Sequence, residues 1–388
     1  MLDNVAGCLY TCGMYRQIRG ELSRLIDSER QPVILVLGMR QAGKTTLVKD
    51  IVGVQRGVYY NFELLPDRQY WSDQSRHRLE QVAARHKDKI VVIDEVQVMP
   101  EATVVIKHLY DSYRTRFVLT GSSELRIRFG VGDSLAGRIH EVRLYPLSLT
   151  EINIQNGLKF DINQEWNNYD QNLTELVKYL TYGSMPEIQN LPQERNVEYL
   201  RNYTNTLLSK DLLELGGMRK PVQVYRLMQL LAGQIGQLVN FNELAQMTEM
   251  SRVSVVRYVG IFEQMGLVVR ARPISTNERE SISKATKIYF TDLGVRNSLV
   301  DNFSWETRTD KGQLLENAVF MGLRRQIDYS KKMAQLGFFR SSHGAEIDIV
   351  YKTKDEEKLY EVKLFKLDLR GKKGVELVNF DNAQKFLY

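Results

Sequence analysis

The stretch that decides the fold is Val33-Ile-Leu-Val-Leu-Gly38-Met-Arg-Gln-Ala-Gly43-Lys44-Thr45. Its first five residues form a short, continuous apolar run rich in β-branched side chains, which predicts a strand buried on both faces of a parallel sheet. The glycine-rich turn Gly38–Gly43 follows, and Lys44–Val54 has the pattern of a helix. Strand, glycine-rich loop and helix in this order direct backbone N–H groups and a helix N-terminus at one point, which predicts an anion site.

The loop matches the phosphate-binding pattern G-x-x-x-x-G-K-[ST] in full. We expect it to bind ATP with Mg²⁺, with Lys44 reaching the β- and γ-phosphates and the Thr45 hydroxyl ligating the metal. A loop of this pattern that binds no nucleotide is the alternative, which the intact Lys44 and Thr45 disfavour. The expected nucleotide contacts are Gly38, Met39, Arg40, Gln41, Ala42, Gly43, Lys44, Thr45 and Thr46.

A second apolar strand, Lys89–Asp94, ends in the acids Asp94 and Glu95. Because charges are costly inside a core, these acids must lie at the exposed carboxyl end of the strand, where ligands bind in open α/β sheets. We expect Asp94 to hold magnesium, mostly through water, and Glu95 to orient and deprotonate the attacking water. The alternative is a pair of acids that only ends the strand.

Two further positions carry polar residues suited to the γ-phosphate. Ser122, just after the strand Phe117–Thr120, is expected to sense that phosphate, with Ser123 as second choice and an ordinary turn serine as the alternative. Arg138 is expected to meet the charge that develops on the γ-phosphate, supplied within the chain or from a neighbour. An exposed surface arginine is the alternative for Arg138, and its rivals for the role are Arg126 and Arg128.

Strands alternate with helices from Val33 to Leu144, and Pro146 then breaks the pattern. This alternation predicts an α/β domain with a parallel sheet. The expected strands after the first are Gly57–Phe62, Lys89–Asp94, Phe117–Thr120 and Ile139–Leu144, and the expected helices are 14–30, Lys44–Val54, 70–86 and Thr103–Tyr113.

Together these residues resemble the AAA+ superfamily of ATPases, and more narrowly the predicted bacterial and archaeal ATPases with a C-terminal winged helix and a restriction-nuclease-like segment. The resemblance implies a Walker A motif at 38–45, Walker B acids at 94–95, a sensor-one role near Ser122 and an arginine finger at Arg138. It also implies that subunits assemble so that one completes its neighbour's site. The matching stretches cover most of 15–150 and are Gly38–Thr46, Tyr60–Glu63, Val92–Gln97, Leu119–Ser123, Ser134–Arg138 and Leu144–Leu147.

Residues 222–295 have the pattern of a winged helix. A short helix at Asn240–Met250 precedes Ser251, a suitable N-cap for a second helix at Arg252–Met265. In such folds the second helix enters the major groove of DNA. The wing would consist of two strands and a polar loop, at Leu267–Pro273, Lys287–Phe290 and 274–283.

Positive charge on this second helix and on the wing suits contacts with DNA phosphates. The net charge of +6 permits nucleic-acid binding without demanding it. A winged helix that packs against a protein is the alternative. The candidate DNA contacts are Arg252, Arg257, Arg270 and Arg272, with Ser254 and Tyr258 also expected to face outward.

The last part of the chain combines acids and a lysine as metal-dependent nucleases do. Glu316 lies in an expected helix, Asp348 in one strand, and Glu361 and Lys363 on one face of the next. Two carboxylates and a lysine can hold magnesium and activate water for phosphodiester cleavage, and the set resembles the PD-(D/E)xK nucleases. Glu346 is a substitute acid. Residues 368–388 look polar and irregular, so an inactive remnant packed on the winged helix is the alternative.

We therefore expect three parts: an ATPase domain at 1–150, a helical region with the winged helix at 151–305, and a partial nuclease-like segment at 306–388. The main hypothesis is an ATP-hydrolysing switch coupled to DNA binding. The alternatives are an ATP-gated, metal-dependent nuclease, and an ATPase whose C-terminal half binds a partner protein.

The composition is that of an ordinary soluble protein, with 43% hydrophobic and 26% charged residues. No apolar run approaches the roughly 20 residues that a membrane helix needs, and the N-terminus lacks a signal-peptide pattern. Cys8 and Cys12 are too few for a disulfide framework and are expected to be free thiols. We expect a cytoplasmic protein that does not bind membranes.

Overall fold

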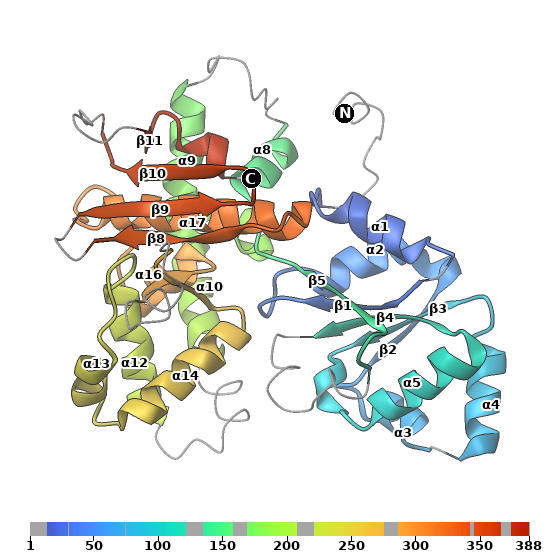
Figure 1. The fold of residues 1–388 in the computed structure, drawn as a ribbon. Coiled ribbons are helices and arrows are strands. Elements are labelled where there is room, and N and C mark those ends of the chain that lie inside the picture. Colours follow the sequence, from blue (N-terminus) through green and yellow to red (C-terminus); the bar gives the residue numbers. More distant parts are fainter. Residues whose placement is uncertain are drawn as a thin grey trace.

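The computed structural model describes residues 14–29, 31–73, 75–121, 135–157, 169–207, 221–274, 286–341, 345–365 and 374–387. Its N-terminal half is built on a five-stranded sheet in the order β2-β3-β4-β1-β5, in which all neighbouring strands run parallel (Figure 1). This arrangement confirms the expected α/β fold. The strands are β1 (Val33–Leu37), β2 (Gly57–Asn61), β3 (Ile90–Asp94), β4 (Arg116–Gly121) and β5 (Ile139–Arg143).

Helices cover both faces of this sheet, which explains why its central strands are apolar along their whole length. Alternate residues of β1 and β3 pack against α1 and α2 on one face and against α3, α4 and α5 on the other. The helices are α1 (Arg19–Ile26), α2 (Lys44–Arg56), α3 (Leu65–Ser72), α4 (Arg76–Arg85) and α5 (Ala102–Tyr113), and a 3₁₀ turn, η1 (Val96–Val98), follows β3.

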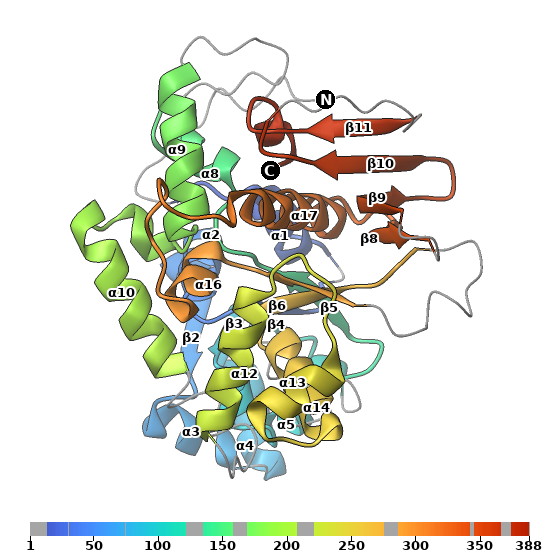
Figure 2. The same cartoon turned by 90° about the vertical axis from the view of Figure 1, so that its left-hand side faces the viewer.

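The second half begins with helices that pack around α16 (Leu293–Leu299). In Figure 2, α9 (Tyr169–Tyr182) and α10 (Gln193–Thr206) lie along one side of the molecule, and α16 contacts both. A shared apolar core joins α10 and α16 to the helices and the hairpin that the sequence predicts as a winged helix. The remaining elements of this part are α8 (Leu149–Gln155), η2 (Pro186–Gln189), α12 (Pro221–Gly233), α13 (Phe241–Thr248), α14 (Arg252–Gln264), β6 (Val268–Ala271) and β7 (Lys287–Phe290).

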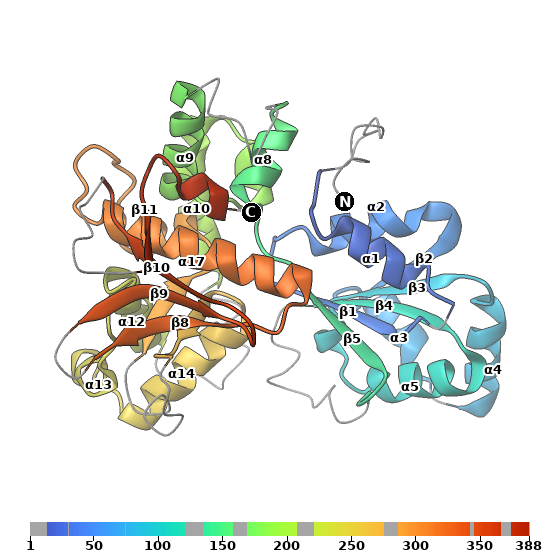
Figure 3. The ribbon, with the colours of Figure 1, turned by 45° about the horizontal axis from the view of Figure 1, so that its top comes forward.

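A second sheet, in the order β11-β10-β9-β8, lies against the long helix α17 (Lys311–Ser330), as Figure 3 shows. Its outer pair, β10 and β11, runs parallel, and the other pairs are antiparallel. The expectation that 368–388 is irregular is wrong, because this stretch contains β11 and the 3₁₀ turn η4. The elements are β8 (Gln335–Arg340), β9 (Glu346–Lys352), β10 (Glu357–Val362), β11 (Val375–Val378) and η4 (Ala383–Phe386).

The second sheet and the β6–β7 hairpin are separate sheets that an isolated bridge connects. Phe338 of β8 accepts a backbone hydrogen bond from Ile274 at 2.7 Å, and it donates one to Arg272 at 3.3 Å. Tyr289 of β7 stacks on Phe320 of α17, with ring centroids 4.0 Å apart. The segment after residue 306 therefore shares its core with the hairpin and with α9.

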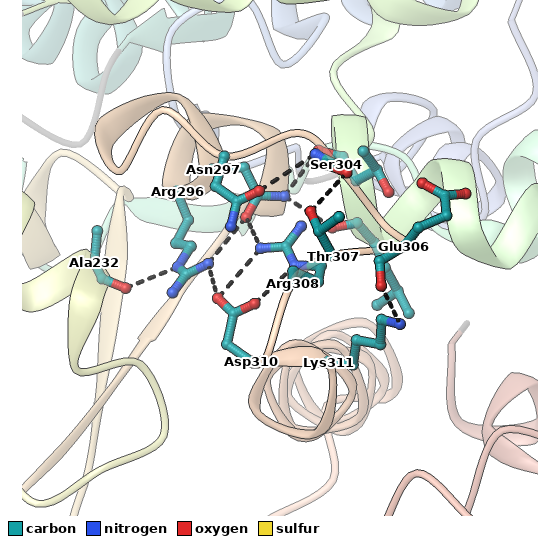
Figure 4. A network of polar contacts seen from close by, with 12 residues as sticks. Ala232, Arg296, Asn297, Ser304, Glu306, Thr307, Arg308, Asp310 and Lys311 are labelled. Atoms are coloured by element: carbon teal, nitrogen blue, oxygen red, sulfur yellow. Dashed lines mark hydrogen bonds and ion pairs between the residues drawn. The ribbon is translucent and has the colours of Figure 1, made fainter.

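A buried ionic network also ties α16 to the segment before α17 (Figure 4). Arg308 donates to Asp310 at 2.7 Å and to Asn297 at 2.9 Å, while Arg296 donates to the backbone carbonyl of Ala232 at 2.7 Å. Burial alone would raise the pKa of Asp310, but hydrogen bonds and charge from the two arginines lower it to about 2. Asp310 therefore stays ionised and paired at neutral pH.

The linker between the two halves is held by buried arginines. Arg325 of α17 donates to the carbonyl of Pro146 at 3.0 Å, and Arg16 donates to the carbonyl of Tyr145. The N–H of Leu147 donates to the carbonyl of Ser184 at 2.9 Å. These bonds satisfy linker carbonyls that are far from water and fix the direction in which the chain leaves the first sheet. None of the helices in the described ranges is long and apolar enough to cross a lipid bilayer.

Two glycines of α17 test this packing, because an alanine normally stabilises a helix relative to glycine. A Cβ at Gly322 would lie 1.8 Å from the carbonyl oxygen of Phe386, whereas a Cβ at Gly312 would meet nothing within 4 Å. We predict that Gly322→Ala lowers the free energy of unfolding by about 2 kcal/mol, and that Gly312→Ala raises it by about 0.5 kcal/mol. Urea denaturation measures both, and a stabilising Gly322→Ala would contradict the packing of η4 on α17.

Candidate active site

The loop between β1 and α2 curls into a cradle of backbone amides. Gln41 and Gly43 adopt left-handed conformations, with φ of 62° and 92°. A Cβ at Gly38 would lie 2.2 Å from the carbonyl oxygen of Leu144, so only glycine fits there. Among the described residues no side chain caps the N-terminus of α2. Its first N–H groups are therefore available to an anion such as a phosphate.

Lys44 lies within this cradle and is buried. Its Nζ donates to the carbonyl oxygens of Gly38 at 2.9 Å and Met39 at 3.0 Å. These contacts hold the ammonium group beside the loop, where phosphate oxygens would compete for the same donors.

Asp94, at the end of β3, contacts the start of α2 and the end of β4. Its Oδ2 accepts a hydrogen bond from the Thr45 hydroxyl at 2.8 Å, and its Oδ1 accepts one from the Thr120 hydroxyl. The hydroxyl and the carboxylate are oxygen ligands of the kind that Mg²⁺ prefers, so this pair fits the expected metal. Thr120 was not predicted as a site residue, although its position at the carboxyl end of β4, the strand next to β3, indicates that it lies near Asp94.

Glu95 has a left-handed backbone, with φ of 54°, and its side chain lines the same cavity as Lys44 and Asp94. Burial raises the pKa of the Glu95 carboxyl, and the positive charge of Lys44 opposes this effect. The amide of Gln97 donates a hydrogen bond to Glu95 Oε2. Gln97 was not singled out from the sequence.

These groups open onto a cavity of about 740 Å³. One wall is the phosphate-binding loop with both acids, and the other comes from residues outside the first sheet. Most of this second wall was not predicted, because its residues from Pro186 to Tyr199 lie about 150 positions from the loop and only a turn at 183–186 was apparent from the sequence. The wall residues beyond the first sheet and its helices are Met14, Arg16, Pro186, Glu187, Asn190, Leu191 and Tyr199.

Two tyrosines of α10 join the second wall to the loop directly. The Tyr199 hydroxyl donates to Oε1 of Gln41 at 2.6 Å, and the Tyr203 hydroxyl donates to the carbonyl oxygen of Arg40 at 3.1 Å. The turn before α10 is fixed from the other side by the buried Asp292, whose carboxylate accepts the N–H of Ser184 at 2.7 Å. The loop is therefore in contact with helix α10 and, through this turn, with α16.

Of the remaining candidates of the ATPase half, Arg138 lies within the described residues, and it is not brought into this cavity. Arg138 pairs with Asp111 at 2.7 Å, and its carbonyl oxygen accepts the N–H of Val33 at 2.9 Å. Because β1 and β5 run parallel, Arg138 lies at the edge of the sheet opposite the loop. An arginine-finger role stays a prediction and would require a second copy of the chain. The other candidates, Ser122, Ser123, Arg126 and Arg128, lie outside the described residues.

The nuclease-like residues do come together, but they pair with lysines. Lys363 contacts Asp348 at 3.1 Å and Glu361 at 3.0 Å. Lys287, which was expected only as the first residue of a wing strand, lies between Glu316 at 3.1 Å and Glu346 at 2.8 Å. Burial raises the pKa of Glu316 to about 7, against the lowering effect of Lys287. In the described part of the chain no group of three or more His, Cys, Asp or Glu side chains is arranged to hold a metal ion.

The expected DNA-contacting arginines fall into two classes. Arg252, Arg257 and Arg272 are exposed. Arg270 pairs with Glu263 at 2.7 Å and lines a cavity of about 110 Å³ facing the first sheet, so its position does not favour a DNA contact. Tyr258, which was expected to face outward, is half-buried and packs partly against the core that contains α13 and α14.

The sheet order, the loop and the two acids agree with a comparison against known families. Residues 30–153 match the family model of the AAA domain. The match covers this loop, both acids and all five strands, and it supports a P-loop ATPase domain. Beyond the AAA domain, residues 173–306 and 311–383 match two domains of unknown function, DUF8612 and DUF4143.

Similar proteins extend this likeness beyond the AAA domain without assigning a role. An uncharacterized protein of Methanocaldococcus jannaschii is 24% identical over 74% of this chain and 66% of its own length. Uncharacterized proteins of Mycobacterium tuberculosis and Haemophilus influenzae are 25% and 23% identical, over 86% of this chain and 70% and 83% of their own lengths. The chain thus spans about two thirds of the first relative.

Solved structures give only a weak likeness. The Orc1 protein of Aeropyrum pernix, in complex with DNA, matches 74% of this chain and 91% of its own at 14% identity and a TM-score of 0.31. The replication initiator DnaA, bound to AMPPCP and single-stranded DNA, matches 64% and 86% at 12% identity and a TM-score of 0.28. These TM-scores support no functional assignment.

The acids Glu316, Glu346, Asp348 and Glu361, which pair with Lys287 and Lys363, are called here the lysine-filled carboxylate cluster, and this cluster yields a stability prediction. The Lys287 side chain is only 3% exposed, and replacing it by methionine leaves Glu316 and Glu346 without their shared cation. We predict that Lys287→Met lowers the free energy of unfolding by about 3 kcal/mol. The matched control is Lys352→Met, which removes an exposed ion pair with Glu357 and should cost no more than about 0.5 kcal/mol. Equal losses for the two variants in urea denaturation would contradict a structural role for Lys287.

Proposed function

We propose that the chain binds ATP with Mg²⁺ in the cavity between the phosphate-binding loop and α10, and that it hydrolyses the nucleotide. The observation that carries this proposal is the convergence of Lys44, Thr45 and Asp94 below an uncapped helix N-terminus. The cradle has the donors that a triphosphate requires, and the cavity of about 740 Å³ is large enough for a nucleotide.

The residues divide the expected chemistry between them. Thr45 and Asp94 would hold Mg²⁺, directly or through water, and the bound metal neutralises charge on the phosphates. Lys44 would turn from the loop carbonyls toward the phosphate oxygens. Glu95 lies next to Asp94 on the cavity wall, where its carboxylate can accept the proton of an attacking water.

The second wall of the cavity supports a nucleotide-dependent conformational switch rather than an ATPase domain that acts without the C-terminal half. A nucleotide in the cavity would contact the loop on one side and the turn before α10 on the other, as the lining residues indicate. Helix α10 packs on α16, which is separated from β7 of the hairpin by two residues. Binding and hydrolysis would therefore change the contacts that position the hairpin and α14.

Two substitutions test the ATPase proposal. We predict that Lys44→Ala abolishes ATP hydrolysis, because the loop loses its cation for the β- and γ-phosphates. We predict that Glu95→Gln retains ATP binding and lowers kcat by at least about tenfold, because an amide cannot take the proton. Phosphate release measures turnover and calorimetry measures binding. Normal turnover by Glu95→Gln would show that another group is the base.

DNA is the partner that the exposed arginines of α14 and the hairpin favour. Ser251 caps α14, accepting the N–H of Ser254 at 3.1 Å, and leaves Arg252 and Arg257 on the exposed side of the helix. The lysine-filled carboxylate cluster favours a structural role over metal-dependent cleavage, so we propose DNA binding without DNA cutting. A protein partner at the same surface is the competing outcome.

A salt titration separates these outcomes. We predict that Arg257→Ala weakens DNA binding and lowers the slope of log affinity against log salt by about one, because one phosphate contact is lost. The control is Arg76→Ala on α4, whose side chain is 91% exposed and far from α14 in the chain. Binding that is absent at low salt, or that responds equally to both variants, would favour a protein partner.

A further inference from the structure

Gln97 contacts the proposed catalytic acid from behind the cavity wall. Its amide Nε2 donates a hydrogen bond to Oε2 of Glu95. Gln97 itself does not line the cavity, whereas Glu95 does. One oxygen of the Glu95 carboxylate is therefore held by a residue that does not line the cavity.

The backbone around Glu95 is shaped to make this contact. Glu95 adopts a left-handed conformation, with φ of 54°, which is uncommon for residues other than glycine. The N–H of Val98 closes the turn onto the carbonyl oxygen of Glu95 at 3.0 Å. This turn brings the side chains of residues 95 and 97 together although they are only two positions apart.

The side-chain oxygen of Gln97 does not stabilise the folded state. Its Oε1 is buried and has no hydrogen-bond partner in the part of the chain that the structure describes. A buried acceptor without a partner is unfavourable, and an apolar side chain of the same length would avoid it. A glutamine at this position is therefore better explained by its contact with Glu95 than by the stability of the turn.

We propose that Gln97 is a positioning residue, which holds the Glu95 carboxylate in the orientation required to activate the attacking water. This inference rests on the proposed ATPase function and deepens it. Three charged groups also face Glu95, namely Lys44 of the loop, Asp94 of β3 and Glu63 after β2. All three groups line the cavity, whereas Gln97 does not. The amide therefore contacts the carboxylate from a different side, and the orientation of the carboxylate depends on it.

The test is a double-mutant cycle on the full chain, with kcat and KM for ATP as readouts. We expect Gln97→Met to lower kcat about tenfold with KM for ATP unchanged, because the amide acts on the base and not on binding. In the Glu95→Gln background the same substitution should have no further effect, since the group on which Gln97 acts is already gone. Val98→Ala, in the same turn and exposed, is the matched control and should keep normal turnover.

Thermal unfolding separates positioning from folding, because Gln97→Met should be at least as stable as the wild-type chain. An unchanged or raised kcat in Gln97→Met, or a loss that adds in full to that of Glu95→Gln, would overturn the inference while leaving the ATPase proposal intact. Absence of ATP hydrolysis by the wild-type chain would overturn the proposed function, and the inference with it.

Discussion

The hydrogen bond between the Thr45 hydroxyl and the Asp94 carboxylate joins the start of α2 to the end of β3, and the proposed chemistry depends on it. The parallel sheet imposes this meeting, because the carboxyl ends of β1 and β3 lie at the same edge on either side of β4. Buried apolar strands keep the edge rigid, and polar groups are confined to the ends of the strands. Thr120 of the intervening strand completes the arrangement by donating to the same carboxylate.

The first sheet and its loop are predictable from sequence because they follow from local signals. A short apolar run rich in β-branched residues favours a strand covered on both faces, and the glycines and lysine that follow it match the pattern of a phosphate-binding loop. Thr120 and Gln97 were not predicted, because their roles depend on how neighbouring side chains turn. The second wall of the cavity was not predictable either, since Tyr199 contacts Gln41 across 158 positions of the chain.

The C-terminal half shows where pattern reading is incomplete. The residue types and spacing of Glu316, Asp348, Glu361 and Lys363 suggested one shared site, but they could not show that Lys287 enters from the hairpin and pairs with Glu316 and Glu346. Strand β11 escaped prediction because four residues carry little periodicity, and its hydrogen bonds come from β10. In the structure Lys287 thus joins the hairpin to α17 and to the second sheet through Glu316 and Glu346, and a nuclease role for these acids stays a prediction.

The proposed function depends on one anion cradle beside a hydroxyl and a carboxylate that would share a metal ion. Calorimetric titration of the purified chain with ATP, with Mg²⁺ and with the metal chelated, tests this most directly. We predict one nucleotide site per chain, with affinity at least about tenfold higher in the presence of Mg²⁺, because Thr45 and Asp94 contribute only through the metal. Equal affinity without metal, or no binding of ATP under either condition, would contradict the account.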